Sequence, residues 1–369
     1  MLLYISYVDF DAFYAQGVHR KIRAQLRAMK KGLCNAYYTG WSYPKALLCS
    51  EDGIVETEPA VTKRDYVNTL IKWIQKYGVT RVYIRYSRTD VWFIELLKYL
   101  SENKIKNVLE ITTYPYDIEA AEGIAKQEHF CFDRDICRYV NRIATFSTHR
   151  EIWGITCLNL MNGIDIDEHP LSRKEYDGKK IVFIAVSTMQ YWHGYERILK
   201  GMYLYYQAGG EYDFRLKFVG DGPERAYYEE LITRYCLQRH VEFVGRIEID
   251  EKEKLDDQYS LSDIAVGSLG LYKLYKVSEK NEEILPIKLS EYCVRGIPFI
   301  CGHRDLRFTP GWEFMLSVPN DDEPIDMNRV IDFYKKIVSK DNYKQLMRDY
   351  AEKYLTWDKI MEPVVEYFQ

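Results

Sequence analysis

The stretch EEILPIKLSEYCVRGIPFICG carries acidic and basic residues at the predicted start of a helix, a combination that could take part in binding or catalysis. Two carboxylates, Glu283 and Glu291, are separated by seven residues, and Pro286 fits the first turn of a helix, where its missing N–H group is not needed. The positive end of that helix can hold a diphosphate, to which Lys288 adds a full charge. The free backbone N–H groups expected there lie near Ile284, Leu285 and Ile287. Carboxylates beside such a site accept hydrogen bonds from ribose and sugar hydroxyl groups, although surface carboxylates also occur at this spacing.

The elements that must position these residues follow one pattern in both halves of the chain. Short apolar runs alternate with longer amphipathic stretches, which is typical of parallel βαβ units. Strands are predicted at 2–8, 33–39, 81–86, 107–114, 142–147 and 156–162, and again at 180–187, 213–220, 241–245, 264–269 and 297–302. Helices are predicted at 18–31, 63–78, 90–103, 195–209, 224–236 and 286–296, followed by a helical pair from residue 325. Sheets of this kind bind ligands at the carboxyl ends of their strands.

Several segments together resemble one protein family. The E-x7-E motif followed by EYCVRGIPFI resembles the donor-site helix of GT-B glycosyltransferases of the retaining family 4 type. The segments that resemble other parts of that family, in the same order, are QGVHRKI (16–22), LMNGIDID (160–167), AVSTMQYWHGYERILKG (185–201), FVGDGPE (218–224) and VEFVGRI (241–247). The resemblance implies an α/β fold of GT-B architecture, with two Rossmann-like domains whose parallel sheets face a central cleft.

The resemblance also implies domain boundaries. An acceptor-binding domain is expected at 1–165, and a nucleotide-sugar-binding domain at 180–352. The polar stretch between them, broken by Gly and Pro, indicates a linker at 166–179. Residues 353–369 are expected to form a helix that crosses back to the first domain.

Roles in donor binding follow from the same resemblance. Glu291 is expected to bind the nucleotide ribose, and Glu283 the hydroxyl groups of the transferred sugar. His193 stands where the family often has Lys, so it is expected to donate a hydrogen bond to a phosphate oxygen while Lys288 supplies the permanent charge. The further donor-side candidates are Arg197, Gly220, Ile284, Leu285, Gly245 and Arg246. A packed loop histidine at 193 and a plain tight turn at 220–223 are the alternatives.

Fewer residues indicate the acceptor side. Gly17 opens a helix and lets the backbone approach a sugar or phosphate closely. Tyr114, Tyr116 and Asp117 follow a predicted strand, so they are expected at its carboxyl end, where Asp117 either orients the acceptor hydroxyl or caps a helix. The family often carries a histidine in this region, but none aligns here, because the nearest, His129, lies too far along the chain.

Composition limits the function classes. The formal net charge of −4 argues against general nucleic-acid binding, and the 47% hydrophobic share matches a soluble globular protein. No apolar run approaches the length of about 20 residues that spans a bilayer, and the first residues lack the features of a signal peptide, so a cytoplasmic location is expected. The cysteines and histidines show no metal-site spacing, and no D-x-D pair lies in a plausible loop, so neither metal nor cofactor is expected. The 33 tyrosines stand out, and composition does not assign them to a core or to a cleft.

The segment 19–31 combines six basic residues with an apolar stripe. It is either an ordinary solvated helix face or a contact with anionic membrane lipid. The second interpretation fits a transferase that elongates lipid-linked sugars, and it places the protein at the inner face of the cell membrane.

These observations favour a glycosyltransferase, in which a nucleoside-diphosphate sugar, UDP- or GDP-linked, donates its sugar to a hydroxyl group. The expected acceptor is a glycan or a polyprenyl-diphosphate-linked saccharide. The resemblance further implies retention of the anomeric configuration and assembly of a capsule, O-antigen or exopolysaccharide in bacteria. The alternatives are a sugar-nucleotide 2-epimerase on the same fold and a non-catalytic partner subunit.

Overall fold

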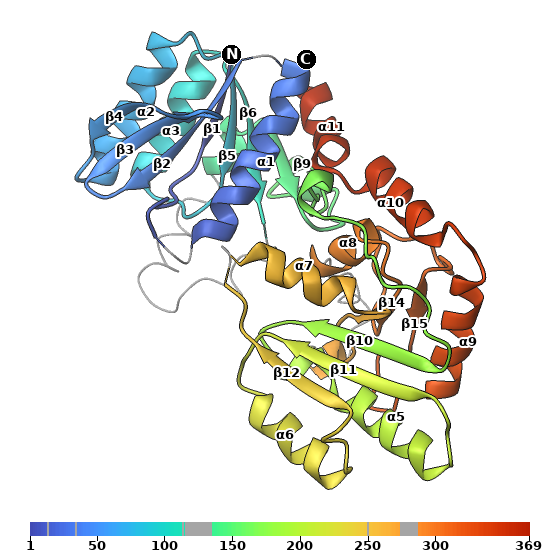
Figure 1. The fold of residues 1–369 in the computed structure, drawn as a ribbon. Helices are drawn as coiled ribbons and strands as arrows, with labels where there is room; N and C mark the ends of the chain where they lie inside the picture. Colours follow the sequence, from blue (N-terminus) through green and yellow to red (C-terminus); the bar gives the residue numbers. More distant parts are fainter. Residues whose placement is uncertain (13–14, 34, 113, 115–134, 249–250, 274–286) are drawn as a thin grey trace. The chain divides into compact units, whose positions relative to one another are not determined.

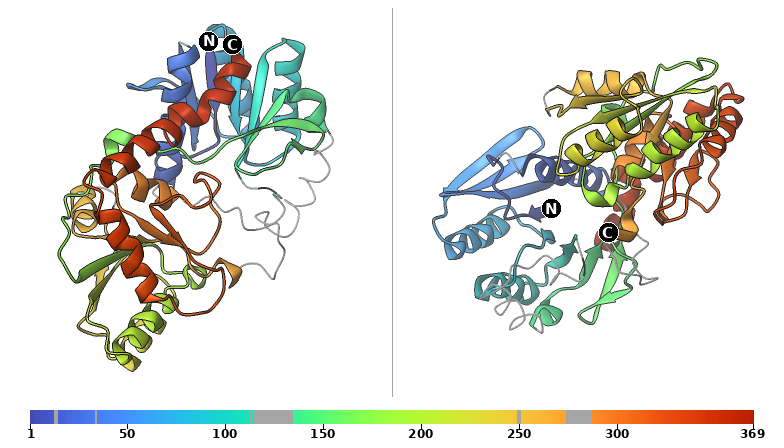
Figure 2. Two further views of the ribbon diagram at one scale, coloured as in Figure 1. Left: turned by 90° about the vertical axis from the view of Figure 1, so that its right-hand side faces the viewer. Right: turned by 90° about the horizontal axis from the view of Figure 1, so that it is seen from below.

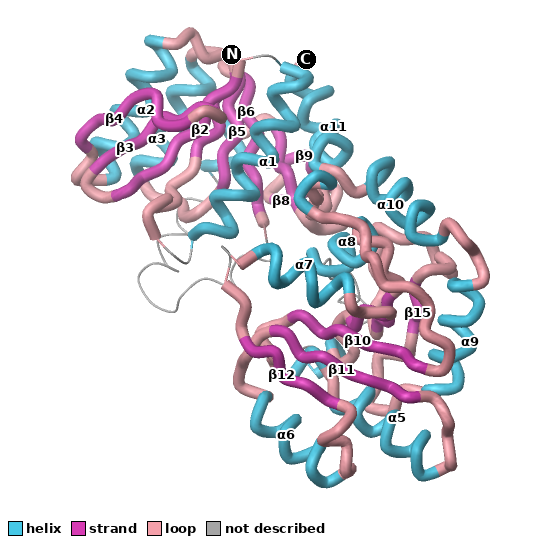
Figure 3. The backbone as a smooth tube through the Cα atoms, viewed as in Figure 1, coloured by secondary structure: helices cyan, strands magenta, loops and turns pink. Residues whose placement is uncertain are grey.

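The chain folds into two α/β units. The computed structural model describes residues 1–12, 15–33, 35–112, 114, 135–248, 251–273 and 287–369. The first unit contains Met1–Asn162 and Trp357–Gln369, and the second contains Gly163–Thr356. Each unit is a largely parallel sheet with helices on both faces (Figures 1 and 3), which confirms the predicted fold class.

The first unit is built on a nine-stranded sheet of order β4-β3-β2-β1-β5-β6-β7-β9-β8. Its strands are β1 (Leu2–Ile5), β2 (Ala36–Ser42), β3 (Lys45–Ser50), β4 (Gly53–Pro59), β5 (Arg81–Arg85), β6 (Lys106–Ile111), β7 (Arg142–Thr145), β8 (Glu151–Ile152) and β9 (Ile155–Asn159). Its helices include α1 (Gln16–Leu33), α2 (Lys63–Lys76), α3 (Val91–Glu102) and α11 (Trp357–Phe368). The strands β3, β4 and β8 pair antiparallel and were not predicted from the sequence.

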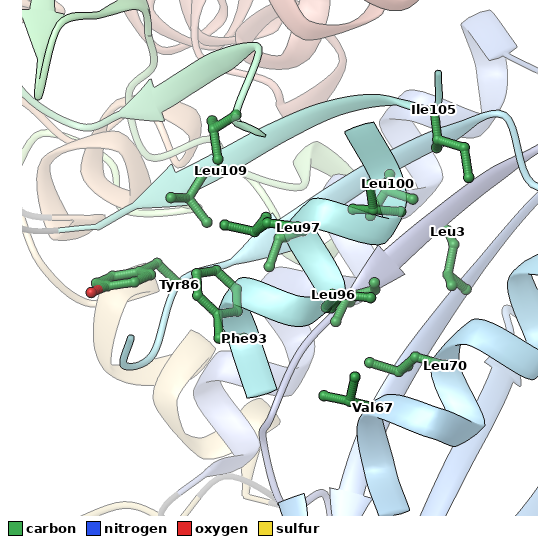
Figure 4. Close-up of a cluster of buried hydrophobic side chains, with 14 of the residues drawn as sticks. Leu3, Val67, Leu70, Tyr86, Phe93, Leu96, Leu97, Leu100, Ile105 and Leu109 are labelled. Atoms are coloured by element: carbon green, nitrogen blue, oxygen red, sulfur yellow. The ribbon is translucent and has the colours of Figure 1, made fainter. Parts of the chain in front are cut away.

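Side chains along each strand point alternately to the two faces of this sheet, and apolar side chains on both faces are covered by helices. Leu3 and Ile5 point to one face, where they join side chains of α2 and α3 in a single core (Figure 4). Leu2 and Tyr4 point to the other face, which α1 and α11 cover. Figure 2 shows α11 beside α1, and Gly32 permits this approach, because a Cβ there would lie 2.3 Å from a methyl group of Val365.

The second unit has a six-stranded parallel sheet of order β12-β11-β10-β13-β14-β15. Its strands are β10 (Lys180–Val186), β11 (Asp213–Val219), β12 (Val241–Gly245), β13 (Ile264–Val266), β14 (Phe299–Cys301) and β15 (Met315–Ser317). Its α-helices include α5 (Glu196–Gln207), α6 (Arg225–Arg234), α7 (Lys252–Ser260), α8 (Ile287–Val294), α9 (Met327–Val338) and α10 (Tyr343–Tyr354). The core places α5, α6 and α9 on one face and α7, α8 and α10 on the other. The sequence did not predict α7 or β15.

The segment predicted as a linker belongs to the second unit. The backbone N–H of Ser172 donates to the carbonyl of Arg295 at 2.8 Å, and Arg348 donates to the carbonyls of Ile166 and His169 at 3.1 and 2.6 Å. The chain therefore leaves the first unit at residue 162 and returns at 357, rather than at 165 and 353. These two passages are adjacent, because the N–H of Ile164 donates to the carbonyl of Leu355.

A buried carboxylate organises the middle of the first sheet. Glu110, next to the end of β6, is fully buried and accepts hydrogen bonds from Gln25 at 2.6 Å, Tyr83 at 2.7 Å and Arg85 at 2.5 Å. Burial alone would raise the pKa of Glu110, but the charges of Lys21 and Arg85 and these hydrogen bonds hold that pKa below its usual value. The carboxylate therefore stays ionised and joins α1, β5 and β6.

Replacing the carboxylate of Glu110 should lower the free energy of unfolding. Glu110→Gln leaves Arg85 and Lys21 without their buried counter-charge, so we expect a loss of about 3–5 kcal/mol of unfolding free energy at pH 7, measured by urea denaturation with circular dichroism. Because the folded pKa is lowered, the contribution of Glu110 is present above the unfolded pKa of about 4.3 and is lost as the pH falls through the folded pKa. Glu102→Gln, at an exposed end of α3, is the control and should change stability by less than about 0.5 kcal/mol. Equal effects of the two substitutions would refute this role of Glu110.

Candidate active site

Helix α8 is fixed at the carboxyl ends of β13 and β14. Five of its eight residues are buried. The hydroxyl of Tyr292 donates to the carbonyl of Val266 at 3.2 Å, and the hydroxyl of Ser290 accepts from Arg307 at 2.8 Å. The thiol of Cys293 donates to the carbonyl of Met347. These bonds hold α8 where the strand ends converge, so the polar residues of α8 take up fixed positions there.

Lys288 is a buried cation without a hydrogen-bond partner among the residues that the structure describes. Burial lowers the pKa of its ammonium group to about 8, although Cys301 and Glu291 act in the opposite direction. Its Nζ lies 5.9 Å from the centre of the Tyr195 ring. An unpaired buried charge costs several kcal/mol. Its presence at the end of a parallel sheet, the usual place for ligands, indicates a site for an anion.

His193 lies beside this cation and is neutral. Its Nδ1 accepts a hydrogen bond from the N–H of Gln190 at 2.9 Å, and its ring stacks on Tyr195 with centres 5.4 Å apart. Burial, and then the charge of Lys288, lowers the pKa of His193 to about 3. Because Nδ1 accepts, the proton of the neutral ring lies on Nε2. His193 is thus a hydrogen-bond donor without charge, in agreement with its predicted role and also with a packed position.

Glu291 lies one turn after Lys288 on α8 and is partly buried. The hydroxyl of the buried Tyr259 donates to its Oε2 at 3.3 Å. The other residues predicted around this helix, Glu283, Ile284 and Leu285, lie outside the described residues. Of the predicted donor site, the structure therefore brings together Lys288, His193 and Glu291.

The two glycines predicted for donor binding differ in their surroundings. Gly220 has a φ of 119°, and a Cβ there would lie 2.0 Å from the carbonyl oxygen of Ser187. This glycine is therefore required for the packing of the turn after β11. Gly245 has a φ of 83°, a Cβ there would meet no protein atom within 4 Å, and the adjacent Arg246 pairs with Glu248 at 3.0 Å. Gly245 ends β12 and Arg246 follows it, at the carboxyl edge of the second sheet.

The hydrogen bonds of Arg197 indicate a role in the scaffold. Its guanidinium is buried and donates to the carbonyls of Glu323, Leu269 and Pro319 at 2.7, 2.5 and 3.0 Å, and to the carboxylate of Asp321 at 2.7 Å. These bonds anchor the loop that precedes α9. They favour a scaffold role over the predicted contact with the donor.

On the acceptor side, Tyr114 is the predicted residue whose surroundings are most informative. Its ring lies 4.9 Å from that of His149, in an edge-on arrangement. The Nδ1 of His149 is 2.9 Å from the hydroxyl oxygen of Ser147, which lies 3.0 Å from that of Thr145. Thr145 ends β7, Ser147 and His149 follow it, and Tyr114 follows β6, so an exposed histidine lies at the carboxyl edge of the first sheet. Sequence reasoning missed it, although the polar S-T-H after a predicted strand was a usable signal.

The other acceptor-side predictions divide in two. Gly17 lies in the first turn of α1, and a side chain there would meet no protein atom within 4 Å. This space is compatible with the predicted close approach of a ligand. Tyr116 and Asp117 lie outside the described residues.

The basic face of α1 is partly neutralised. Arg27 and Lys30 both pair with Glu51, at 3.0 and 2.9 Å, and Lys31 pairs with Asp358. Lys21 turns inward and donates to Asn162 at 3.1 Å, and burial lowers its pKa to about 8. Fewer basic groups are therefore available to a membrane surface than the sequence indicates.

The described residues contain no group of three or more side chains arranged to hold a metal ion. In these same parts of the chain, we find no helix both long enough and apolar enough to cross a membrane.

Comparison with known proteins identifies relatives of this fold. Residues 168–305, which include Lys288, His193 and Glu291, match the family described as glycosyl transferases group 1. A search of curated proteins by sequence gave no match. A glycosyltransferase from Rickettsia africae aligns over 100% of this chain and 97% of its own, with a TM-score of 0.63 and 14% identity.

Two further solved structures are similar over nearly their whole length. HepE of Anabaena, solved in complex with UDP, gives a TM-score of 0.61 at 12% identity, covering 100% of this chain and 99% of its own. The apo form of WaaB, a lipopolysaccharide outer core galactosyltransferase, gives 0.59 at 12% identity, with the same coverage. These likenesses concern the fold.

The protonation of His193 can be tested directly. We expect its imidazole to stay neutral from pH 8 to pH 5, with the proton on Nε2, because burial opposes the charged form and Nδ1 accepts from the backbone. Nitrogen-15 NMR of the histidine-labelled protein, with His193→Gln to assign the signal, measures this. A His193 signal that titrates near a pH of about 6.5 would contradict the described environment.

Proposed function

We propose that this chain, a GT-B glycosyltransferase whose residues 168–305 match the glycosyl transferases group 1, moves a sugar from a nucleoside-diphosphate sugar to a hydroxyl group of a saccharide acceptor. One observation carries the proposal. The buried, unpartnered ammonium of Lys288 lies at the carboxyl edge of the second sheet, one helical turn from the carboxylate of Glu291, with no hydrogen-bond partner among the described residues.

The donor fits these groups in a defined way. The charge of Lys288 and the Nε2–H of His193 bind the diphosphate, and the carboxylate of Glu291 accepts hydrogen bonds from the ribose. Glu283 remains proposed for the hydroxyl groups of the transferred sugar. During transfer the bond between the anomeric carbon and the diphosphate oxygen breaks, and negative charge grows on the leaving diphosphate. A cation already fixed in a site of low polarity stabilises that charge without reorganisation.

The acceptor contributes its hydroxyl oxygen to the new glycosidic bond, and its proton leaves with the diphosphate product. We assign acceptor contact to His149, Ser147 and Tyr114 at the carboxyl edge of the first sheet, together with Asp117, Tyr116 and the open space at Gly17. His149 offers a hydrogen-bonding ring nitrogen, and Tyr114 offers an aromatic face to a sugar. Retention of the anomeric configuration is proposed from the family match alone.

The finer identity of the substrates is also part of the proposal. HepE was solved with UDP and with UDP-glucose, which supports a UDP-linked donor over a GDP-linked one. The fold of WaaB supports an acceptor on a bacterial surface polysaccharide or its lipid-linked precursor. The reaction as proposed needs no metal or further cofactor. A peripheral membrane contact through residues 19–31 remains a prediction, for which Arg20 and Arg23 are exposed and form no ion pair with the described residues.

The donor site predicts opposite effects on stability and on binding. Lys288→Met removes an unpaired buried charge, so the melting temperature should rise or stay unchanged. The same change removes charge-assisted hydrogen bonds to the diphosphate, so the affinity for UDP, measured by calorimetry, should fall about 10- to 100-fold. Lys200→Met, at an exposed position of α5, is the matched control and should leave the affinity for UDP unchanged. Unchanged UDP affinity in Lys288→Met would disprove the donor site.

A substitution on the acceptor side should change the rate of sugar transfer and leave donor binding unchanged. His149→Ala should lower the rate of sugar transfer about tenfold or more and leave the dissociation constant of UDP unchanged, because His149 belongs to the other unit. Transfer is followed as UDP release from a panel of UDP-sugars with and without lipid-linked saccharide. Glu151→Ala, two residues away, is the control. If the wild-type chain converts the donor in the absence of an acceptor, it is the epimerase. If it converts no donor under any condition, it is the non-catalytic subunit.

A further inference from the structure

A cavity in the second unit lies away from the proposed donor site. It has a volume of about 490 Å³. It is lined by residues at the starts of β10 and β12 and in the middle of β11, by residues that precede β10 and β12, and by Leu261 after α7. Because all strands of this sheet run parallel, these residues lie toward the end of the sheet opposite to Lys288 and Glu291. The cavity therefore shares no residue with the donor site.

The strand register gathers basic side chains in this cavity. Along β11, Arg215 and Lys217 point to one face, while Phe214, Leu216 and Phe218 point into the core on the other. Lys180 begins the neighbouring strand β10, and Arg239 precedes β12. Lys174, from the segment that leads into the sheet, also lines the cavity. Five cationic side chains thus surround one cavity.

The carboxylates nearby do not neutralise this charge. Glu242, beside Lys217 in the sheet, is the one acidic residue that lines the cavity among the described residues. Arg215 is engaged by Asp213 at 2.9 Å, and Lys174 lies 3.8 Å from the buried Asp263. Lys180 and Arg239, in contrast, form no ion pair with any residue that the structure describes. Among the residues that line the cavity, Glu242 is therefore the counter-charge for three cations, Lys180, Lys217 and Arg239.

Lys217 lines this cavity and has a neutral hydrogen-bond partner. It is half-buried, and its Nζ donates to the side-chain oxygen of Gln258 at 3.1 Å, a neutral partner. Burial lowers the pKa of Lys217, Glu242 raises it, and the nearby charge of Lys180 lowers it again. Two ammonium groups that line one cavity repel each other, and an anion bound in that cavity reduces the repulsion.

We propose that this cavity binds the phosphate groups of a second ligand. Two ammonium groups supply point charges, and the planar guanidinium of Arg239 can bind two phosphate oxygens at once. The volume is in the range of small-molecule sites and exceeds what a single phosphate fills. The ligand is therefore a phosphorylated or diphosphorylated molecule, either free in solution or carried as the headgroup of an anionic lipid. This site goes beyond the proposed transfer reaction, because it lies outside the donor site.

The test uses two probes on the full chain. Inorganic diphosphate is titrated by calorimetry in the presence of saturating UDP, and vesicles of phosphatidylcholine with and without phosphatidylglycerol are tested by co-sedimentation. The variant is Lys180→Gln with Lys217→Gln, and its fold is checked by circular dichroism. The matched control is Lys200→Gln with Lys336→Gln, two exposed lysines of the same unit.

We expect the double cavity variant to weaken binding at least about tenfold for one of the two probes, and the control pair to leave it unchanged. A loss confined to diphosphate identifies a soluble ligand, and a loss confined to phosphatidylglycerol vesicles identifies a lipid headgroup. Absence of binding to both probes by the wild-type chain, or equal binding by wild type and cavity variant, would overturn the proposal. Donor binding is measured separately with UDP, so a failure here is distinguishable from a failure of the transferase assignment.

Discussion

A parallel sheet brings the ends of all its strands to one edge, and the chemistry of this protein depends on which charges are buried near that edge. The first unit buries Glu110 there and surrounds it with donors, so the charge is fully compensated. The second unit buries Lys288 without a hydrogen-bond partner among the described residues. The same geometry thus gives one charge that stabilises the fold and one that is available to an anion.

Three buried tyrosines bind carboxylates at the edges of the cores. Three carboxylates each accept a hydrogen bond from a buried tyrosine hydroxyl: Glu110 from Tyr83 at 2.7 Å, Asp263 from Tyr334 at 2.5 Å and Glu291 from Tyr259 at 3.3 Å. Tyrosine fills core volume and also brings a donor to its rim. Composition alone left these residues unassigned, and the structure shows that a large share of them belong to the two cores. The fully buried ones are Tyr4, Tyr66, Tyr83, Tyr195, Tyr228, Tyr259, Tyr292 and Tyr334.

The sequence was sufficient for the elements with a strong local pattern. Most of the buried parallel strands and amphipathic helices were predicted within a few residues, because apolar runs and helical periodicity are local properties. Helix α7, with one buried residue, and the partly exposed strand β15 lack such a pattern and were missed. The antiparallel pair β3–β4 was missed, since its pairing partners lie on the edge of the sheet and its last strand is largely exposed. The environment of Arg197 was not predictable either, because its partners Leu269 and Glu323 are far away in sequence. His149 was missed although its polar neighbours follow a predicted strand, and its packing against Tyr114, which follows a different strand, could not be read from that local signal.

The return of the chain at Trp357 affects the order in which the molecule is made. Helix α11 contributes Trp357, Ile360, Met361, Val364 and Phe368 to the core of the first unit. During synthesis on the ribosome, every residue of the second unit emerges before this helix does. The second unit can therefore fold on its own sequence, while the face of the first sheet that α1 and α11 cover together must wait with the α11 part uncovered. The unit that is translated first is therefore completed last. Until α11 emerges, the apolar face of the first unit is open, and during this stage the nascent chain is most prone to aggregate or to bind chaperones.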